Sequence, residues 1–294
     1  MTRKLLQSLA CAAFALAAPL ASHAAAFLWE VSSMTGRVYL YGTVHAGKPD
    51  WYPLPNVVEK ALEDSTALVV EADISDIEGM RKSQPANYVP PDTLAKHVDP
   101  AAYERFRKLL PRYRLPEAQV VQMKPFIAVS LLVFAEWARQ GFQPELSVDG
   151  YLIQKAREQK KPVRELEGLE TQMQLMDSLT EEEGKRIFQG TVDALESGLT
   201  GEQIQGMVKA WQDGDPKAML DTARRYNENV AGAREFEEKF VWDRHEAMLQ
   251  KIEGFLNQSR DRDFVAVGAL HLAGPRGLVE MLRKRGYLVR QLGT

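Results

Sequence analysis

Segments with strand composition lie near both ends of this chain, and a long helical stretch separates them. Short apolar runs bounded by turn residues occur three times between residues 27 and 70, and residues 264–267 repeat that composition. Over residues 75–260, apolar side chains instead recur three and four positions apart, which is typical of amphipathic helices. We therefore predict an α/β (mixed α+β) fold. Its central sheet is built from residues 27–74 and 262–294, and residues 75–260 form a helical insertion.

The first 26 residues have the composition of a secretory signal peptide. Arg3 and Lys4 precede an apolar stretch over residues 9–21, and small residues follow where a signal peptidase would cut. The stretch is shorter than the roughly 18 to 20 residues that span a bilayer, so we predict cleavage rather than a retained anchor helix. The expected product, residues 27–294, is a periplasmic or secreted single-domain protein with no transmembrane helix.

The composition excludes several classes of protein. The only cysteine, Cys11, lies in the predicted signal peptide, so the mature chain has no thiol for disulfides or for nucleophilic catalysis. Cleavage would remove two of the 37 Lys and Arg residues and none of the 40 Asp and Glu residues. Nucleic-acid-binding proteins normally carry a basic surface, and this acidic chain gives no sign of one. We expect no nucleic-acid partner.

The same short pattern closes two of the predicted strands. Gly42 is followed by His45 and Gly268 by His271, each three positions later and each after an apolar run. Open α/β sheets place functional side chains at such strand ends, and glycine tolerates the backbone angles of a sharp exit. Glu71 ends a third predicted strand, and two imidazoles with a carboxylate are the ligands of many open metal sites.

Two simpler interpretations of these residues stay open. A single Gly-x-x-His segment is common by chance, and each histidine by itself fits a strand-end residue satisfied by hydrogen bonds. Glu71 by itself fits an ordinary exposed carboxylate, because the residues that follow it are also acidic.

Several segments together resemble the TraB/GumN family, whose eukaryotic relatives include the Tiki metalloproteases. The resemblance covers nearly the whole mature chain. The segments that carry it are residues 38–45, Leu54-Pro55, Val69-Val70-Glu71, Lys124-Pro125, residues 148–152, Leu169-Glu170-Thr171 with Gln172, and residues 267–272 with Gly274 and Gly277.

The resemblance implies a Tiki/EreA/ChaN-like fold with a divalent metal ion, Mn, Co or Zn, held by His45, His271 and Glu71. It also implies a conserved arginine beside the metal, which matches Arg244. The family usually has asparagine after that arginine, whereas this chain has His245, which would keep a hydrogen bond, contact substrate or add a metal ligand. The catalytic carboxylate that accepts a proton would be Glu71 or Glu170.

These features predict an exported metal-dependent hydrolase, a peptidase acting on a peptide or protein substrate through metal-activated water. Arg244 would stabilise the oxyanion or orient a substrate carboxylate. One alternative is a non-catalytic periplasmic binding or regulatory module that captures a peptide, haem or a polysaccharide intermediate. A second alternative is a haem or iron protein with His45 or His271 as an axial ligand.

Overall fold

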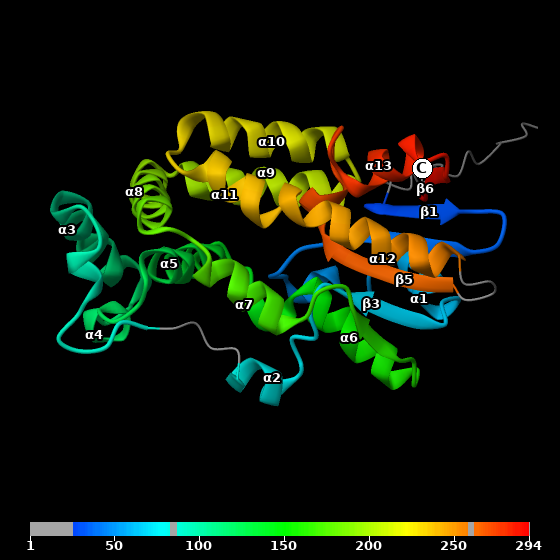
Figure 1. Cartoon of the computed structure of the whole chain (residues 1–294), viewed down its shortest axis with the longest axis horizontal. Coiled ribbons are helices and arrows are strands. Elements are labelled where there is room, and N and C mark those ends of the chain that lie inside the picture. Colours follow the sequence, from blue (N-terminus) through cyan, green and yellow to red (C-terminus); the bar gives the residue numbers. More distant parts are fainter. Residues whose placement is uncertain (1–25, 83–86, 258–261, 294) are drawn as a thin grey trace, which may run out of the picture.

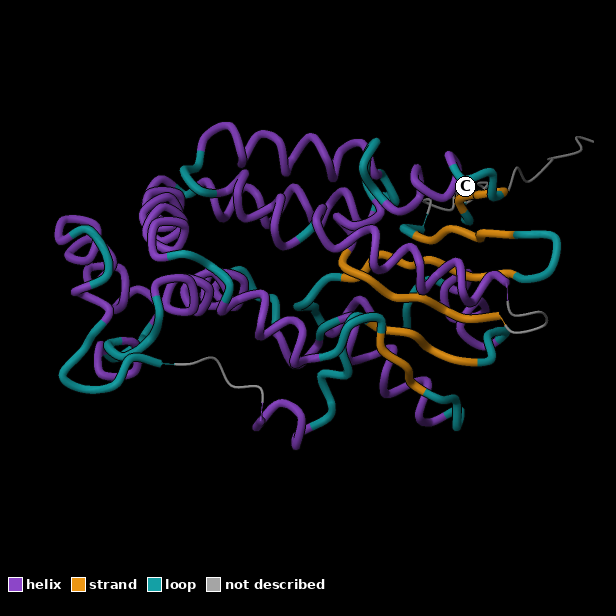
Figure 2. The backbone as a smooth tube through the Cα atoms, in the orientation of Figure 1, coloured by secondary structure: helices purple, strands orange, loops and turns teal. Residues whose placement is uncertain are grey.

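The computed structural model describes residues 26–82, 87–257 and 262–293, which form one mixed sheet and an extensive helical part (Figures 1 and 2). The predicted signal peptide lies outside these residues except for Ala26. The six strands lie in the order β4-β3-β5-β2-β1-β6. They are β1 Leu28–Ser32, β2 Arg37–Thr43, β3 Ala67–Val70, β4 Val163–Glu165, β5 Arg262–Gly268 and β6 Leu288–Gln291.

Four neighbouring strands of the sheet are parallel. Strands β2, β3, β4 and β5 run in one direction, and β5 pairs with β2 in a register that places Gly268 opposite Thr43. Strand β1 is reversed and forms a hairpin with β2, while β6 pairs antiparallel with β1. Four neighbouring strands therefore end at the same edge of the sheet.

The helices account for most of the remaining described residues, as the periodicity predicts, and the predicted fold class is confirmed. No helix among the described residues is long and apolar enough to cross a membrane. The α-helices are α1 Asn56–Glu63, α2 Ile77–Lys82, α3 Pro100–Leu109, α4 Glu117–Val120, α5 Pro125–Arg139, α6 Val148–Glu158, α7 Leu169–Asp177, α8 Glu181–Ser197, α9 Leu199–Gln212, α10 Pro216–Asn229, α11 Ala233–Phe240, α12 His245–Asn257 and α13 Leu278–Lys284.

One strand lies where the sequence predicts only helices. Strand β4 interrupts the predicted insertion and pairs with β3 at the edge of the sheet. It is three residues long and only partly buried, so it has neither the length nor the alternation by which a strand is recognised. The sheet therefore contains a contribution from the middle of the chain as well as from both ends.

Among the described residues, the two largest of four buried apolar clusters stabilise different parts of the fold. The larger surrounds the sheet, where the side chains of β3 and most of β5 are fully buried, as expected for parallel strands covered on both faces. The second joins α3, α5 and α8 through residues such as Phe106, Leu132 and Phe188. These helices lie at the end of the molecule opposite the sheet (Figure 1).

Candidate functional site

Two histidines and two glutamates follow the carboxyl ends of the four parallel strands. His45 lies two residues after β2, and Glu71 comes immediately after β3. Glu167 lies two residues after β4, and His271 lies in the 3-10 helix η6, Ala269–Leu272, which follows β5. Because parallel strands end at one edge of the sheet, residues from both ends and the middle of the chain meet there.

Gly268 marks the space around which three of these side chains converge. A methyl group built on its Cα would lie 3.4 Å from Glu71 Oε1, 3.5 Å from His271 Cδ2 and 3.8 Å from His45 Nε2. The backbone of Gly268 has φ −50° and ψ 135°, which other residues also adopt. The expectation that glycine is needed here for unusual backbone angles is therefore wrong. A methyl group at this position would make ordinary van der Waals contact with both imidazoles and the carboxylate, and it would occupy the region on which they converge.

Glu71 is a buried carboxylate surrounded by donors and positive charge. Its Oε1 accepts a 2.7 Å hydrogen bond from the Gly268 amide, and its Oε2 accepts bonds from Arg244 and, over 3.3 Å, from Gln172. Burial alone would raise the pKa of Glu71, but His271, Arg244 and His45 outweigh burial and lower it to about 2. Glu71 is therefore ionised at every physiological pH.

Arg244 joins Glu71 to the second carboxylate, Glu167. It ends the 3-10 helix η5, Trp242–Arg244, and its side chain is only 13 % exposed. Its Nη2 bonds to one oxygen of each carboxylate, and its Nε donates to Glu167 over 3.0 Å. Its Nη1 donates to His271 Nε2 over 3.2 Å. Burial disfavours the charge, but the two carboxylates outweigh burial and raise the pKa of Arg244 further, so the guanidinium is a permanent cation in the site.

His45 has one nitrogen held by a carboxylate, and its other nitrogen faces the site. Its Nδ1 lies 3.0 Å from Asp149 Oδ2, while the Thr43 hydroxyl donates to Asp149 Oδ1 over 2.7 Å. Since an ionised carboxylate only accepts, Nδ1 carries a hydrogen and Nε2 is the atom nearest the Gly268 space. The charge of Asp149 raises the pKa of His45 to about 9. The His45 side chain is 64 % exposed, so this side of the site is open.

His271 is buried, and each of its nitrogens has a partner. Its Nδ1 lies 2.9 Å from Nε2 of His245, and Nδ1 of His245 lies 2.7 Å from the backbone carbonyl oxygen of Arg276. Its Nε2 faces Arg244 and lies 3.6 Å from Glu71 Oε1. Burial lowers the pKa of His271 to about 3 and that of His245 to about 4. Both imidazoles are therefore neutral at pH 7.

The donor set suits a divalent metal ion, although Arg244 occupies part of it. Two imidazoles and a carboxylate each come within 3.8 Å of the position of a methyl group on Gly268, and this combination matches the ligands of many divalent-metal sites. Within residues 26–82, 87–257 and 262–293, however, no three His, Cys, Asp or Glu side chains are already arranged to hold an ion. Arg244 explains why these side chains are not arranged to hold an ion, because its N–H groups donate hydrogen bonds to the Glu71 and His271 atoms that would bind the ion.

The structure places the sequence-predicted residues in three different settings. His45, Glu71, Arg244 and His271 lie together around the Gly268 space. His245 is buried behind His271, 2 % exposed, and contacts that imidazole. Glu170 lies on the exposed side of α7, where it accepts a hydrogen bond from Gln174 over 3.2 Å.

Two residues of the site have no role in the sequence-based prediction. Glu167 follows a strand too short to be recognised, so its position at the sheet edge could not be inferred. Asp149 lies in the first turn of α6, where an acidic residue is expected for helix stability alone. Its position in a segment that resembles the TraB/GumN family was the one signal that pointed to it.

The chain matches one protein family over nearly its whole described length. The model of the TraB/PrgY/gumN family matches residues 27–291, nearly the whole described region. The chain belongs to the TraB/PrgY/gumN family. The predicted resemblance is therefore confirmed, and the residues around Gly268 lie at both ends and in the middle of the matched region.

Relatives of this TraB/PrgY/gumN chain include bacterial and animal proteins. "Uncharacterized protein YbaP" of Escherichia coli (strain K12) is 26 % identical over 83 % of this chain and 87 % of its own length. "Metalloprotease TIKI homolog" of Amphimedon queenslandica is 23 % identical over 91 % of this chain and 62 % of its own length. "Metalloprotease TIKI2" of Xenopus tropicalis is 24 % identical over 90 % of this chain and 59 % of its own length. No solved structure matches the chain.

Proposed function

We propose that this TraB/PrgY/gumN protein is a divalent-metal-dependent hydrolase that cleaves peptide bonds. The observation that carries the proposal is the convergence of His45, Glu71 and His271 on the space beside Gly268. The exposed face of His45 leaves that space open on one side, as a catalytic metal site requires. Distant similarity to proteins named metalloproteases supports the same reaction class.

The three converging residues would hold the ion, and the protonation of Glu71 and His271 suits that role. His271 is neutral, and Glu71 with a pKa of about 2 is permanently anionic. A general base works best with a pKa near the operating pH, so Glu71 suits a ligand better than a base. A divalent ion bound there supplies Lewis acidity, which makes hydroxide available near neutral pH and polarises the attacked carbonyl.

Arg244 would stabilise the negative charge that develops on the substrate. Its guanidinium lies beside both Glu71 and His271, so its N–H groups would be close to a carbonyl bound to an ion at these two residues. Glu167 holds the same guanidinium through Nε and Nη2. Binding of an ion at Glu71 and His271 requires Arg244 to leave their lone pairs, and Glu167 provides the contact that keeps it in the site.

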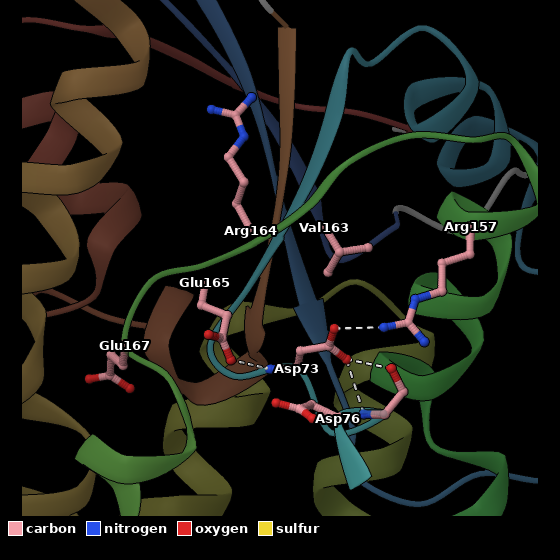
Figure 3. Close-up of a pocket in the computed structure, with 8 residues that line it drawn as sticks. Asp73, Asp76, Arg157, Val163, Arg164, Glu165 and Glu167 are labelled. Atoms are coloured by element: carbon pink, nitrogen blue, oxygen red, sulfur yellow. Dashed lines mark hydrogen bonds and ion pairs between the residues drawn. The ribbon is translucent and has the colours of Figure 1, made fainter. Parts of the chain in front are cut away.

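An open cavity of about 740 Å³ adjoins the site and offers room for an extended substrate (Figure 3). Glu167 belongs to both, because it lines the cavity and bonds to Arg244. The other lining residues are mainly charged, and Figure 3 shows Asp73 paired with Arg157. The cavity is lined by Asp73, Ser75, Asp76, Arg157, Val163, Arg164, Glu165 and Glu167. Such a surface favours a polar peptide over an apolar ligand.

Cleavage of unstructured peptides by the purified protein tests the proposal. We expect cleavage with added Mn²⁺, Co²⁺ or Zn²⁺, its loss with a chelator, and at least a hundredfold loss in His45→Ala and His271→Ala. His97→Ala is the matched control, because His97 bonds to Asp92 in a distant loop. Peptide binding without cleavage, unchanged by the chelator, would instead establish a binding module.

We further propose that the protein acts outside the cytoplasm. The proposal is supported by the composition of residues 1–26, a basic start followed by an apolar stretch and small residues. Fractionation of cells that express the full chain should place a shortened product in the periplasm or medium. Recovery of an uncleaved chain in the cytoplasm would contradict it.

A further inference from the structure

His245 lies between His271 and the protein backbone, and it is not one of the converging side chains. It is the first residue of α12, is buried, and its ring packs edge-on against Trp242 with centroids 5.2 Å apart. Its two nitrogens contact His271 Nδ1 and the Arg276 carbonyl oxygen. The site therefore contains a second imidazole layer for which the proposed hydrolysis gives no direct role.

We propose that His245 is a positioning residue that, together with Arg244, sets the tautomer of His271, so that the Nε2 lone pair of His271 is directed toward the side of the site where Arg244 and Glu71 lie. This inference rests on the proposed function, in which that lone pair binds the ion. His245 would act through His271 and would itself contact neither ion nor substrate.

Arg244 and the backbone carbonyl of Arg276 lie at the two ends of the hydrogen-bonded series that contains His271 and His245. These two groups determine where the protons lie. The Arg276 carbonyl can only accept, so His245 Nδ1 carries a hydrogen. The Arg244 guanidinium can only donate, so His271 Nε2 must present a lone pair. Both assignments follow from groups that can only accept or only donate a hydrogen bond. They do not depend on an assumed protonation state of either imidazole.

One arrangement satisfies every contact between these two ends. Arg244 donates to His271 Nε2, His271 Nδ1 donates to His245 Nε2, and His245 Nδ1 donates to the backbone carbonyl. A hydrogen on His245 Nε2 would face the hydrogen on His271 Nδ1 across 2.9 Å, which leaves two buried donors opposed. The geometry therefore fixes both tautomers together.

The two metal-facing histidines would then be oriented by partners of unlike charge. His45 donates from Nδ1 to the Asp149 carboxylate, whereas His271 donates from Nδ1 to a neutral imidazole. In both cases the outer partner fixes the ring and leaves Nε2 for the ion, which is how second partners orient metal-binding histidines. Changing His245 should therefore change the tautomer and metal affinity of His271 without removing a ligand.

Nitrogen NMR of ¹⁵N-histidine-labelled protein measures the tautomer directly, without added metal. We expect His271, assigned by comparison with His271→Gln, to carry its hydrogen on Nδ1. His245→Phe removes this acceptor but keeps a ring, so Arg244 alone then favours the Nδ1–H tautomer and its population should fall. His245→Asn offers an amide oxygen as acceptor and should retain it. His97→Phe is the control for a ring substitution elsewhere.

Metal affinity provides the second measurement. Titration calorimetry with Mn²⁺ and Zn²⁺ should show a loss of about 10- to 100-fold in His245→Phe, a smaller loss in His245→Asn and no change in His97→Phe. If His245→Phe does not fold, the wild-type tautomer and His245→Asn still decide the question. An Nε2–H tautomer of His271 in the wild type, or an Nδ1–H population that is unchanged in His245→Phe, would overturn the inference. The Nδ1–H tautomer in a protein that binds no metal would support it and contradict the proposed function.

Discussion

The residues around Gly268 differ in charge within a few ångströms. Glu71 is anionic, Arg244 is cationic and His271 is neutral at pH 7, while Asp149 keeps His45 protonated in the absence of a ligand. Each charge has a physical cause in a named neighbour. Substitutions at single positions can therefore test which neighbour sets each charge.

Gly268→Ala should block the site while preserving the fold. The backbone angles of Gly268 accommodate alanine, but the methyl group would lie between Glu71 and both imidazoles. We expect metal affinity to fall at least tenfold and the free energy of unfolding to change by less than about 1 kcal/mol.

Gly254→Ala is the matched control for that substitution. Gly254 lies inside α12, and a methyl group there would have no neighbour within 4 Å. This variant should bind metal normally and gain about 0.5–1 kcal/mol in unfolding free energy, because alanine favours a helix over glycine. Normal metal binding by Gly268→Ala would show that the ion lies elsewhere.

Metal binding should strengthen as the pH rises toward 9. The pKa of His45 is raised to about 9, so below that pH an ion must displace a proton from its Nε2. We expect affinity to increase about tenfold per pH unit between pH 7 and 9. In Asp149→Asn the pKa of His45 returns toward its ordinary value near 6.5, so the affinity should become nearly independent of pH over this range. Calorimetry in buffers of different ionisation enthalpy measures the protons released. Equal pH dependence in the two proteins would refute this assignment.

Among the helices, α5 contains a buried charge that the site does not use. Glu136 is 2 % exposed and accepts hydrogen bonds from Arg139, Gln140 and Tyr113. Burial alone would raise the pKa of Glu136, but these donors outweigh burial and lower it to about 2. Since Tyr113 belongs to the 3-10 helix η3, Leu110–Tyr113, the carboxylate joins that segment to α5.

Glu136→Gln should destabilise the helical part in a pH-dependent way. A carboxyl group with a depressed pKa stabilises the folded state above its unfolded pKa, and this contribution disappears as the pH falls through the folded pKa. We expect a loss of about 2–3 kcal/mol at pH 7 that shrinks between pH 4.5 and 2. Thermal unfolding of both proteins across this range measures it. A difference that stays constant would show that the ionised form makes no special contribution.

The elements that could be predicted from the sequence are those with a clear apolar pattern. Strands β2, β3 and β5 are buried on both faces, so their sequences are continuous apolar runs. Strand β4 has no such run, and for that reason Glu167 was missed. The partner of Asp149 depends on how α6 packs against the end of β2, which no local pattern records. The sequence therefore predicted the converging histidines but not the roles of Glu167 and Asp149.

For the complete chain, the site depends on contacts between distant segments. His45 and Glu71 follow β2 and β3, Arg244 ends η5 before the last long helix, α12, and His271 lies in η6 after β5. An ion that binds these residues together can bind only the folded chain. Metal binding should therefore stabilise the sheet and the adjoining helices as a unit.

Thermal unfolding with and without metal tests that linkage. At a free ion concentration about 100 times the dissociation constant, we expect a gain of about 2.7 kcal/mol, which corresponds to roughly 5–10 °C in Tm for a chain of this size. His45→Ala and His271→Ala should each show no metal-dependent shift. A full shift in either variant would mean that the ion binds other residues.

The most direct measurement is a Co²⁺ titration followed by visible absorption, because ligand-field bands report both the stoichiometry and the ligands. We predict one Co²⁺ per chain with bands of imidazole and carboxylate coordination. The bands should be lost or strongly weakened in His45→Ala, Glu71→Ala and His271→Ala, and unchanged in His97→Ala. Absence of binding by the wild-type protein, or unchanged bands in any of the three variants, would contradict a metal site formed by His45, Glu71 and His271.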